Sequence, residues 1–260
     1  MGRRCKLRKV LYTPSNTIYS LPSEMVVEIL ARLAASSMTD FFKTKSSCKL
    51  FYEVADDDYI YRQISVEELA FKMLHWTKEE SSFYNRCMES GNLEALYHQG
   101  VHKYFTYHLD NESGLDLLKR AACAGHHGAS YVLGIMDLLC HDGDEFTKRG
   151  MKLLSNIKTS LQMLECRRKL QRSACYKWRL QNKDFVRCPK LLSCPFQDRK
   201  RSLWCLYDED DRDNLHCETC ILNREMVVVY RMLTGHSCPS YSYSYGMCLS
   251  RSIDDQDTTI

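Results

Sequence analysis

Apolar and polar residues between 21 and 54 follow the period of short helices rather than that of strands. Pro22 stands where the first turn of a helix tolerates proline, and Glu24 complements the positive end of the helix dipole. The apolar residues that follow are three or four positions apart on one broad face: Met25, Val26, Ile29, Leu30 and Leu33. We therefore expect a helix that begins at Pro22.

Two further helix starts follow the first helix. Ser37 with Asp40 three residues later has the spacing of a capping box, and Ser47 precedes an apolar run that the acidic segment 56–58 is expected to end. Three helices this short enclose a core smaller than the size at which chains are usually stable alone. Such a unit needs a partner.

Residues 91–158 contain an internal repeat. Four residues recur 34 positions later: Gly91, Ala95, Tyr97 and Gly100 correspond to Gly125, Ala129, Tyr131 and Gly134. Three more recur 36 positions later: Gly114, Leu117 and Leu118 correspond to Gly150, Leu153 and Leu154. A period in the mid-thirties is typical of stacked helix–turn–helix units. Gly125 is expected to end a helix in the left-handed conformation. Helices predicted at 66–87 and 161–179 should complete the stack, because two repeats alone are few.

Three motifs give the first segment a family resemblance: Leu-Pro-Ser-Glu at 21–24, Glu-Ile-Leu-Ala-Arg-Leu at 28–33 and Cys-Lys-Leu-Phe at 48–51. In order and spacing they resemble an F-box of the plant type, over residues 20–65. Ala34 departs from the family pattern, which usually has proline there, and Ser47 replaces an apolar residue. The resemblance implies docking on a Skp-type adaptor, which binds the cullin scaffold that carries the ubiquitin-conjugating machinery.

By motif match, the residues implied in the adaptor contact are Leu21, Pro22, Ile29, Leu30 and Leu33. Periodicity alone is equally compatible with an intramolecular core role, above all for Ile29 and Leu33. The function that the resemblance implies is a non-catalytic, substrate-recruiting subunit of a Skp–cullin–F-box ubiquitin ligase. The protein it would recruit is not identified by any motif.

The repeats resemble Sel1-like repeats, relatives of the tetratricopeptide repeat, through Asn-Leu-Glu-Ala-Leu-Tyr at 92–97 and Ala-Ala-Cys-Ala-Gly-His at 121–126. This resemblance implies a protein-binding surface. The alternative is a spacer between the F-box and the C-terminal region.

The segment 181–235 is rich in cysteine. Cys217 and Cys220 have the short spacing that lets two thiolates bind one metal ion, and Cys188 with Cys194 would supply the second pair for a structural zinc. The spacer between Cys188 and Cys194 is wider than usual, so buried free cysteines are the alternative. The chain from 167 to 201 is strongly basic, which suits either an acidic partner or a solvated helix face.

Composition excludes several classes of protein. No stretch reaches the roughly 20 apolar residues of a membrane-spanning helix, and residues 1–10 lack the apolar core of a signal peptide. We therefore expect a cytoplasmic or nuclear protein whose 14 cysteines are reduced. A net charge of +3 is too small to indicate nucleic acid. No catalytic motif is present, and His126 and His127 are interpreted as partners of helix-end carbonyls.

Together the patterns predict an all-α chain that is not an enzyme. Its expected order is a disordered leader (1–19), a three-helix F-box (20–65), a helical-repeat region (66–180), an irregular Cys-rich region (181–235) and a disordered tail (236–260). The rival interpretation is a helical-repeat scaffold with a zinc-stabilised C-terminal region and no ligase role.

Overall fold

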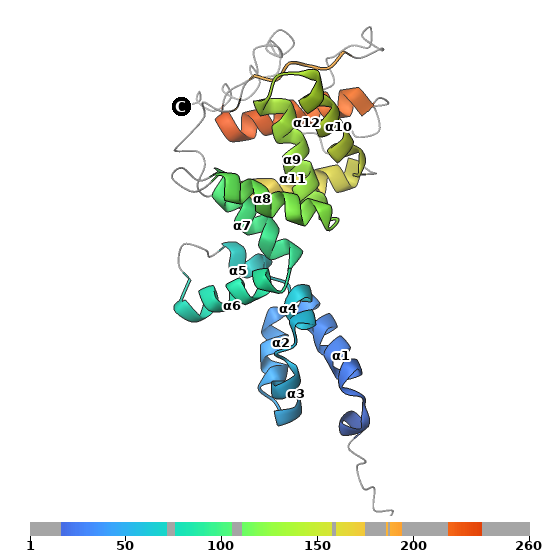
Figure 1. The fold of residues 1–260 in the computed structure, drawn as a ribbon, viewed down its shortest axis with the longest axis vertical. Coiled ribbons are helices and arrows are strands. Elements are labelled where there is room, and N and C mark those ends of the chain that lie inside the picture. The colour runs from blue at the N-terminus through green and yellow to red at the C-terminus, as the bar shows by residue number, and fades with distance from the viewer. Residues whose placement is uncertain are drawn as a thin grey trace, which may run out of the picture. The chain divides into compact units, whose positions relative to one another are not determined.

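Every regular element that the structure, a computed structural model, describes is a helix (Figure 1). The described residues are 17–71, 76–105, 111–157, 160–174, 186, 188–193 and 218–235. The chain divides into two compact units, unit 1 (Met1–Asn92) and unit 2 (Leu93–Ile260). The predicted all-α fold is confirmed. Among the described residues, no helix combines the length and the apolar character needed to span a membrane.

Unit 1 is built of short helices around a small core. They are the 3-10 helix η1 (Thr17–Ser20), α1 (Ser23–Ser36), α2 (Met38–Lys45), α3 (Lys49–Val54), α4 (Asp58–Gln63), α5 (Glu67–Phe71) and α6 (Lys78–Glu89). α1 packs against α2, α3 and α4, and α4 packs against α6. The core consists of fully buried apolar side chains from these helices, among them Val26, Leu30, Phe41, Ile60 and Tyr84.

Local capping explains where the first helices begin. α1 begins directly after Pro22, as predicted. The Ser37 hydroxyl accepts a hydrogen bond from the Asp40 amide at 3.2 Å and starts α2, which confirms the second predicted start. The third helix begins only at Lys49, because the Ser47 hydroxyl donates instead to the carbonyl of Thr44 in the preceding turn.

A fourth helix, α4, lies where the sequence pattern was expected to end. The Asp57 carboxylate accepts a hydrogen bond from the Tyr59 amide at 2.8 Å and caps this helix. Asp58 follows in the first turn, where a negative charge complements the helix dipole. The third helix ends at Val54, before the acidic segment 56–58, as expected, but the fourth helix that this segment starts was not predicted.

Unit 1 extends beyond residues 20–65, the range predicted for the F-box. The F-box boundaries themselves remain a prediction. Its last residue, Asn92, is buried, and its side-chain amide donates to the carbonyls of Tyr61 (2.9 Å) and Ile64 (2.8 Å). These two bonds join the end of the unit to the end of α4. Residues after 65 thus belong to the same compact structure as α1 to α4.

Replacing Asn92 with Ala should lower the free energy of unfolding of unit 1 by about 2 kcal/mol, because two carbonyls lose their buried partner. Urea unfolding of the full chain, followed by circular dichroism, measures the change. Asn85→Ala is the matched control, since Asn85 is exposed on α6 and its replacement should cost less than about 0.5 kcal/mol. Equal costs at the two positions would contradict this assignment of Asn92.

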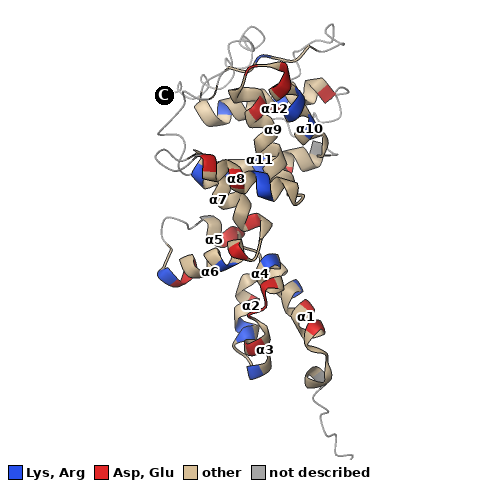
Figure 2. Ribbon diagram, in the orientation of Figure 1, with Lys and Arg blue, Asp and Glu red and all other residues tan. Residues whose placement is uncertain are grey.

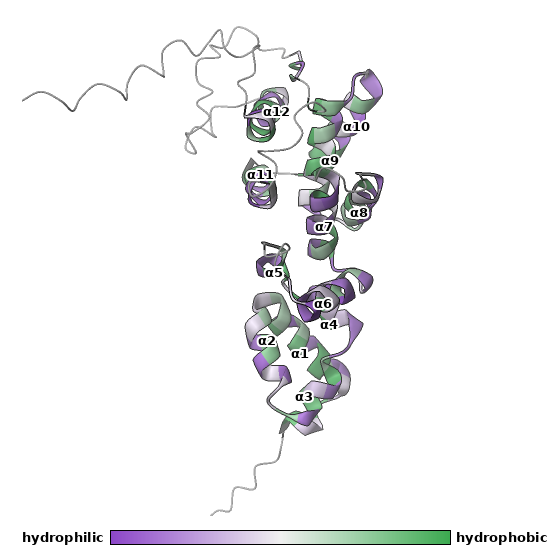
Figure 3. Ribbon diagram, turned by 90° about the vertical axis from the view of Figure 1, so that its left-hand side faces the viewer, coloured by the Kyte–Doolittle hydropathy of each residue, from purple (hydrophilic) through white to green (hydrophobic). Residues whose placement is uncertain are grey.

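Unit 2 stacks two helical hairpins and two further helices. The hairpins are α7 (Leu93–Phe105) with α8 (Asn111–Cys123) and α9 (His127–Cys140) with α10 (Asp144–Ser155). α11 (Ser160–Ala174) packs on α7 and α9, and α12 (Glu218–Thr234) packs on α9 and α11. α9 therefore lies at the centre of the unit, and it is hydrophobic along most of its length (Figure 3).

The predicted repeat corresponds to the two hairpins. Tyr97 and Tyr131, 34 residues apart, are both completely buried. Gly91 and Gly125, which precede α7 and α9, both have positive φ angles, 83° and 93°. Each feature of one hairpin thus recurs in the other, which confirms helix–turn–helix repeats and the left-handed conformation expected of Gly125.

Each hairpin is closed by a pair of facing glycines. A Cβ atom on Gly114 would lie 2.5 Å from the backbone nitrogen of Tyr104 and 3.0 Å from the carbonyl oxygen of Gly100. In the second hairpin a Cβ on Gly150 would lie 2.8 Å from the carbonyl oxygen of Gly134. The two helices of each hairpin therefore meet backbone to backbone, an approach that only glycine permits.

Three other expectations need correction or fall outside the described residues. The segment 181–235 was expected to be irregular, but α12 occupies Glu218–Thr234. The imidazole of His126 caps the next helix instead of a helix-end carbonyl: its Nδ1 accepts the Ala129 amide at 3.0 Å at the N-terminus of α9. Residues 1–16 of the predicted leader and the predicted tail 236–260 lie outside the described residues, whereas Thr17–Ser20 form η1.

Candidate functional site

Exposed apolar side chains gather in unit 1. Among the described residues, eight large hydrophobic side chains are exposed, and seven of these belong to residues 18–59. We call these seven the apolar surface of unit 1: Ile18, Tyr19, Met25, Ile29, Phe42, Tyr52 and Tyr59. The eighth is Leu161 on α11. Because seven of the eight belong to one stretch of unit 1, this part of the chain is the candidate binding surface.

α1 separates its apolar residues into a core face and an outer face. Val26, Leu30 and Ala34 are buried and follow one another at four-residue intervals. Met25 and Ile29, also four residues apart, are 53% and 47% exposed. One turn of helix separates Met25 from Ile29, so these two side chains form a stripe beside the core face.

The five residues implied in the adaptor contact occupy different environments. Pro22 and Ile29 are exposed, and Leu21 and Leu33 are half-buried. Leu30 is completely buried in the core of unit 1. Sequence periodicity left the contact and core roles open; the geometry leaves four of these side chains accessible, and their adaptor role remains a prediction.

Ala34, which departs from the family pattern, is a core residue of unit 1. It is completely buried on α1, and its carbonyl accepts a hydrogen bond from the Ser65 amide at 3.0 Å. Proline at this position would keep that carbonyl but remove an amide from the last turns of α1. The alanine thus allows α1 to continue to Ser36.

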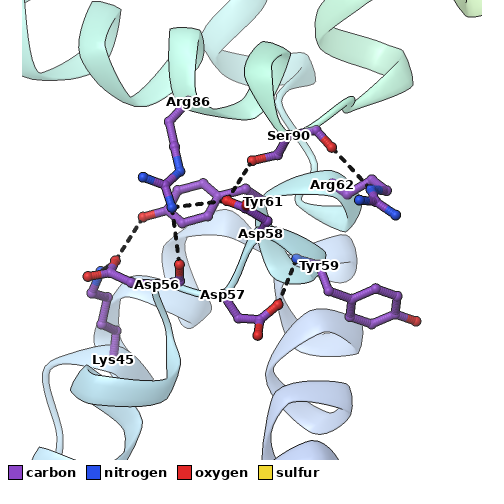
Figure 4. A network of polar contacts seen from close by, with 9 residues as sticks. All are labelled: Lys45, Asp56, Asp57, Asp58, Tyr59, Tyr61, Arg62, Arg86 and Ser90. Atoms are coloured by element: carbon purple, nitrogen blue, oxygen red, sulfur yellow. Dashed lines mark hydrogen bonds and ion pairs between the residues drawn. The ribbon is translucent and has the colours of Figure 1, made fainter.

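A network of polar contacts connects α2, α4 and α6 around the acidic segment 56–58 (Figure 4). Asp56 accepts hydrogen bonds from Lys45 (2.7 Å) and from the Tyr61 hydroxyl (3.0 Å), and Arg86 pairs with Asp58 at 2.9 Å. The hydrogen bond from Lys45 lowers the pKa of Asp56, and burial together with the bond to Asp56 raises the pKa of Tyr61 to about 12. Most of these groups are exposed, so the network orients the helices more than it stabilises them.

Unit 2 holds a half-buried charged cluster around Glu94. Lys169 on α11 donates to Glu94 Oε1, and His126 Nε2 lies 3.3 Å from the same oxygen. Because Nδ1 of His126 accepts the Ala129 amide, the proton of the neutral ring is at Nε2, directed at Glu94. Burial alone raises the pKa of Glu94, but the His126 hydrogen bond and the Lys169 charge lower it to about 2.

A second ion pair, between half-buried Arg167 and buried Glu225, joins α11 to α12. Arg167 Nη1 lies 3.1 Å from Glu225 Oε1, and the Tyr131 hydroxyl donates to Glu225 Oε2 at 2.8 Å. Arg167 and Lys169 of α11 thus both pair with carboxylates of other helices of unit 2. Figure 2 marks the positions of Lys and Arg in blue and those of Asp and Glu in red along the ribbon. At these two positions the basic stretch is neither a solvated face nor a free surface for an acidic partner.

The cysteine prediction is only partly within the described residues. Cys188 is exposed and Cys220 is half-buried on α12, whereas Cys194 and Cys217 lie outside the described part of the chain. No group of three His, Cys, Asp or Glu suited to a metal ion occurs among the described residues. A structural zinc with these four ligands therefore remains a prediction.

Sequence reasoning missed five members of the apolar surface of unit 1: Ile18 and Tyr19, which were assigned to the leader, and Phe42, Tyr52 and Tyr59. Phe42 stands next to the buried Phe41, and its ring contacts Phe41 and Phe83 at centroid distances of 5.4 and 5.3 Å while 40% of the residue stays exposed. Adjacent residues on a helix point in different directions, so the pair Phe41-Phe42 itself was a signal that one ring faces outward.

Known proteins resemble this chain at the sequence level. Residues 68–174 match the family of plant tetratrico peptide repeats. One relative, named as an F-box protein of Arabidopsis thaliana, is 32% identical over 172 residues, 64% of this chain and 56% of that protein. Two more F-box proteins of Arabidopsis thaliana are 30% and 28% identical, over 52% of this chain and 38% and 41% of their own lengths.

The matched part of the chain covers less than two thirds of each of these three relatives. No solved structure matches the chain. The repeat match and the F-box names agree with the two resemblances found in the sequence. The chain is therefore similar to F-box proteins of Arabidopsis thaliana, and its residues 68–174 are similar to plant tetratrico peptide repeats.

Proposed function

We propose that this protein is the substrate-recruiting subunit of a Skp–cullin–F-box ubiquitin ligase. The observation that carries the proposal is the apolar surface of unit 1, on the segment whose motifs resemble an F-box. Unit 1 would dock on a Skp-type adaptor, and unit 2 would present the protein to be modified. The other subunits of the ligase would supply the chemistry, so the chain itself acts without catalysis.

The composition of the apolar surface suits a protein partner. Aromatic residues and methionine are enriched in the cores of protein interfaces, and three of the seven side chains are tyrosines. A tyrosine contributes a large apolar ring together with a hydroxyl that can bind at the polar rim, as Tyr59 does with Glu28 at 3.0 Å. Burial of this surface against an adaptor would also give the small unit the apolar contacts that its own core lacks.

The double substitution Met25→Asp and Ile29→Asp should weaken binding to a Skp-type adaptor at least about tenfold, because two carboxylates would be buried in an apolar interface. Both side chains are exposed, so the fold of unit 1 should be retained. Calorimetric titration of the purified full chain with the adaptor measures the affinity. Leu161→Asp is the matched control, because Leu161 is 58% exposed but lies on α11.

Unchanged affinity of the Met25→Asp, Ile29→Asp variant would exclude the α1 stripe as the contact. No binding by the folded wild-type chain would favour the rival scaffold interpretation. Point variants are preferable to removal of residues 20–65, since that deletion would take away α4, on which α6 packs.

A further inference from the structure

Polar contacts between α11 and α7 converge on one turn of α7. Lys169 of α11 donates to Glu94 Oε1, and its ammonium lies 5.6 Å from the ring centroid of Tyr97. One turn further along α11, the Ser173 hydroxyl lies 3.1 Å from Nδ1 of His98. All three partners on α7 lie within residues 94–98, so whatever changes the charge of this turn changes the contact with α11.

Two buried histidines take part in this contact region. His98 is 4% exposed and His126, which precedes α9, is 9% exposed. Both rings contact the ring of Tyr97, at centroid distances of 5.2 and 4.8 Å, and Tyr97 itself is completely buried. A proton added to either imidazole would therefore be a charge largely removed from water, which is unfavourable.

The contacts of His126 require a neutral ring. Its Nδ1 accepts the Ala129 amide, and only the neutral imidazole has an acceptor nitrogen. Protonation would place an N–H group against that amide N–H and remove the cap of α9. It would also strengthen the attraction between His126 and Glu94, but Lys169 already pairs with the same carboxylate oxygen. The gain is therefore smaller than for an unpaired carboxylate.

His98 is also held in the neutral form. Burial lowers the pKa of His98 to about 4; the charge of Glu94 opposes this shift, and the charges of Lys169 and Arg172 add to it. When the pKa of a histidine is lower in the folded protein than in the unfolded chain, its contribution to folding is fully present above the unfolded value, here about 6.5. That contribution is lost as the pH falls towards the folded value.

The other charges of the neighbouring helices are paired with one another or exposed. Asp137 of α9 pairs with Arg149 of α10, and Glu225 of α12 pairs with Arg167 of α11. His102 lies one turn beyond His98 on α7 and is half-buried. The charged residues described on α8 are exposed: Glu112, Asp116, Lys119 and Arg120. The imidazoles that lie within 4 Å of Glu94 are those of His98 and His126, at 3.7 and 3.3 Å.

We propose that His98 and His126 form a pH-dependent switch that releases α11 from α7 when the pH falls from neutral to mildly acidic values. At neutral pH the uncharged rings keep the cap of α9 and leave Glu94 to Lys169. In acid, two further positive charges join Lys169 around a single carboxylate. Repulsion then acts on α11, which carries Lys169 and Arg172. The inference goes beyond the proposed function and does not depend on it.

Hydrogen exchange of the full chain tests the switch, measured by mass spectrometry at pH 7.5 and 5.5 with exchange times corrected for the intrinsic rate. Protection of the α11 amides should fall at least about tenfold at pH 5.5. Protection of α10, which packs on α9 and bears neither histidine, should change less than about twofold. Constant protection of α11 would overturn the proposal, and so would equal losses in both helices, which would mean that unit 2 unfolds as a whole.

The double variant His98→Asn, His126→Asn should keep α11 protected at both pH values. The amide of asparagine does not titrate, and asparagine is a preferred residue at the cap of a helix, so the cap of α9 can be retained. The double variant His127→Asn, His141→Asn is the matched control, because both of these histidines are exposed. It should keep the full pH dependence of the wild type. The same pH dependence in both double variants would overturn the assignment.

The charge of the two rings can also be measured without a substitution. Nitrogen chemical shifts of the imidazoles, recorded by nuclear magnetic resonance on the wild-type chain, distinguish the neutral ring from the protonated ring. We expect His98 and His126 to stay neutral until α11 loses its protection. Rings that become protonated while α11 remains protected would overturn the proposal even if the asparagine variant failed to fold. None of these measurements uses an adaptor, so their outcome is independent of the ligase role.

Discussion

Gly114→Ala should lower the free energy of unfolding of unit 2 by about 3 kcal/mol, at the upper end of the usual cost of overpacking. The added Cβ would lie 2.5 Å from the backbone nitrogen of Tyr104 and 2.9 Å from its Cα. Backbone atoms cannot rotate away as a flexible side chain can, so α7 and α8 must move apart. Urea unfolding of the full chain, followed by the helical circular dichroism signal, measures the loss.

Gly125→Ala is the matched control for Gly114→Ala. Gly125 has a φ of 93°, and a Cβ added there would have no neighbouring atom within 4 Å, so its replacement adds only conformational strain, worth about 1 kcal/mol. The difference between the two variants isolates the cost of separating the helices. Equal losses would mean that the close approach of α7 and α8 contributes little to the stability of the hairpin.

Arg167→Met should destabilise unit 2 by about 3 kcal/mol at pH 8, because it leaves the Glu225 carboxylate buried without its counter-ion. Glu225 then retains the hydrogen bond from Tyr131 and the weaker influence of the Arg224 charge, but it loses its ion pair. Adding Glu225→Gln to this variant should recover most of the loss, since the amide carries no charge and still accepts from Tyr131. Thermal or urea unfolding of both variants makes the comparison.

The loss in Arg167→Met should shrink as the pH falls. Burial raises the pKa of Glu225 above its ordinary value, and removal of Arg167, whose charge lowers it, raises it further. When the pKa of a carboxyl group is higher in the folded protein than in the unfolded chain, its contribution to folding is fully present below the pKa of the unfolded chain. That stabilisation is lost as the pH rises through the pKa of the folded protein. A smaller deficit at pH 5 than at pH 8 is therefore expected. A deficit independent of pH would show that Arg167 acts through packing alone.

Local and repeated features of the fold could be predicted from the sequence. Ser37 with Asp40 identifies the start of α2 because capping depends on a few adjacent residues. Gly100 recurs as Gly134, and Gly114 recurs as Gly150. This repeat identifies the two hairpins, because the close approach of the two helices in each hairpin demands glycine on both of them. In both cases the physical cause lies within the residues that form the pattern.

Features that depend on distant partners could not be predicted in the same way. Glu225 contacts Tyr131 and Arg167, which are 94 and 58 residues away, and no local pattern couples these positions. The acidic segment 56–58 has the composition of a helix end or of a helix start, and Asp57 decides between them through one side-chain bond. For the candidate site, the sequence identified the apolar residues of α1 but not the division between Leu30, buried, and Ile29, exposed.

The paired glycines of the two hairpins also limit how unit 2 can respond to a partner. Gly134 and Gly150 hold α9 and α10 at backbone contact, as Gly100 and Gly114 hold α7 and α8. Two helices in such contact cannot approach further, so neither hairpin can tighten around a bound molecule. A partner whose shape already matches these hairpins costs unit 2 little conformational entropy on binding, and one that does not match cannot be accommodated by closing the helices.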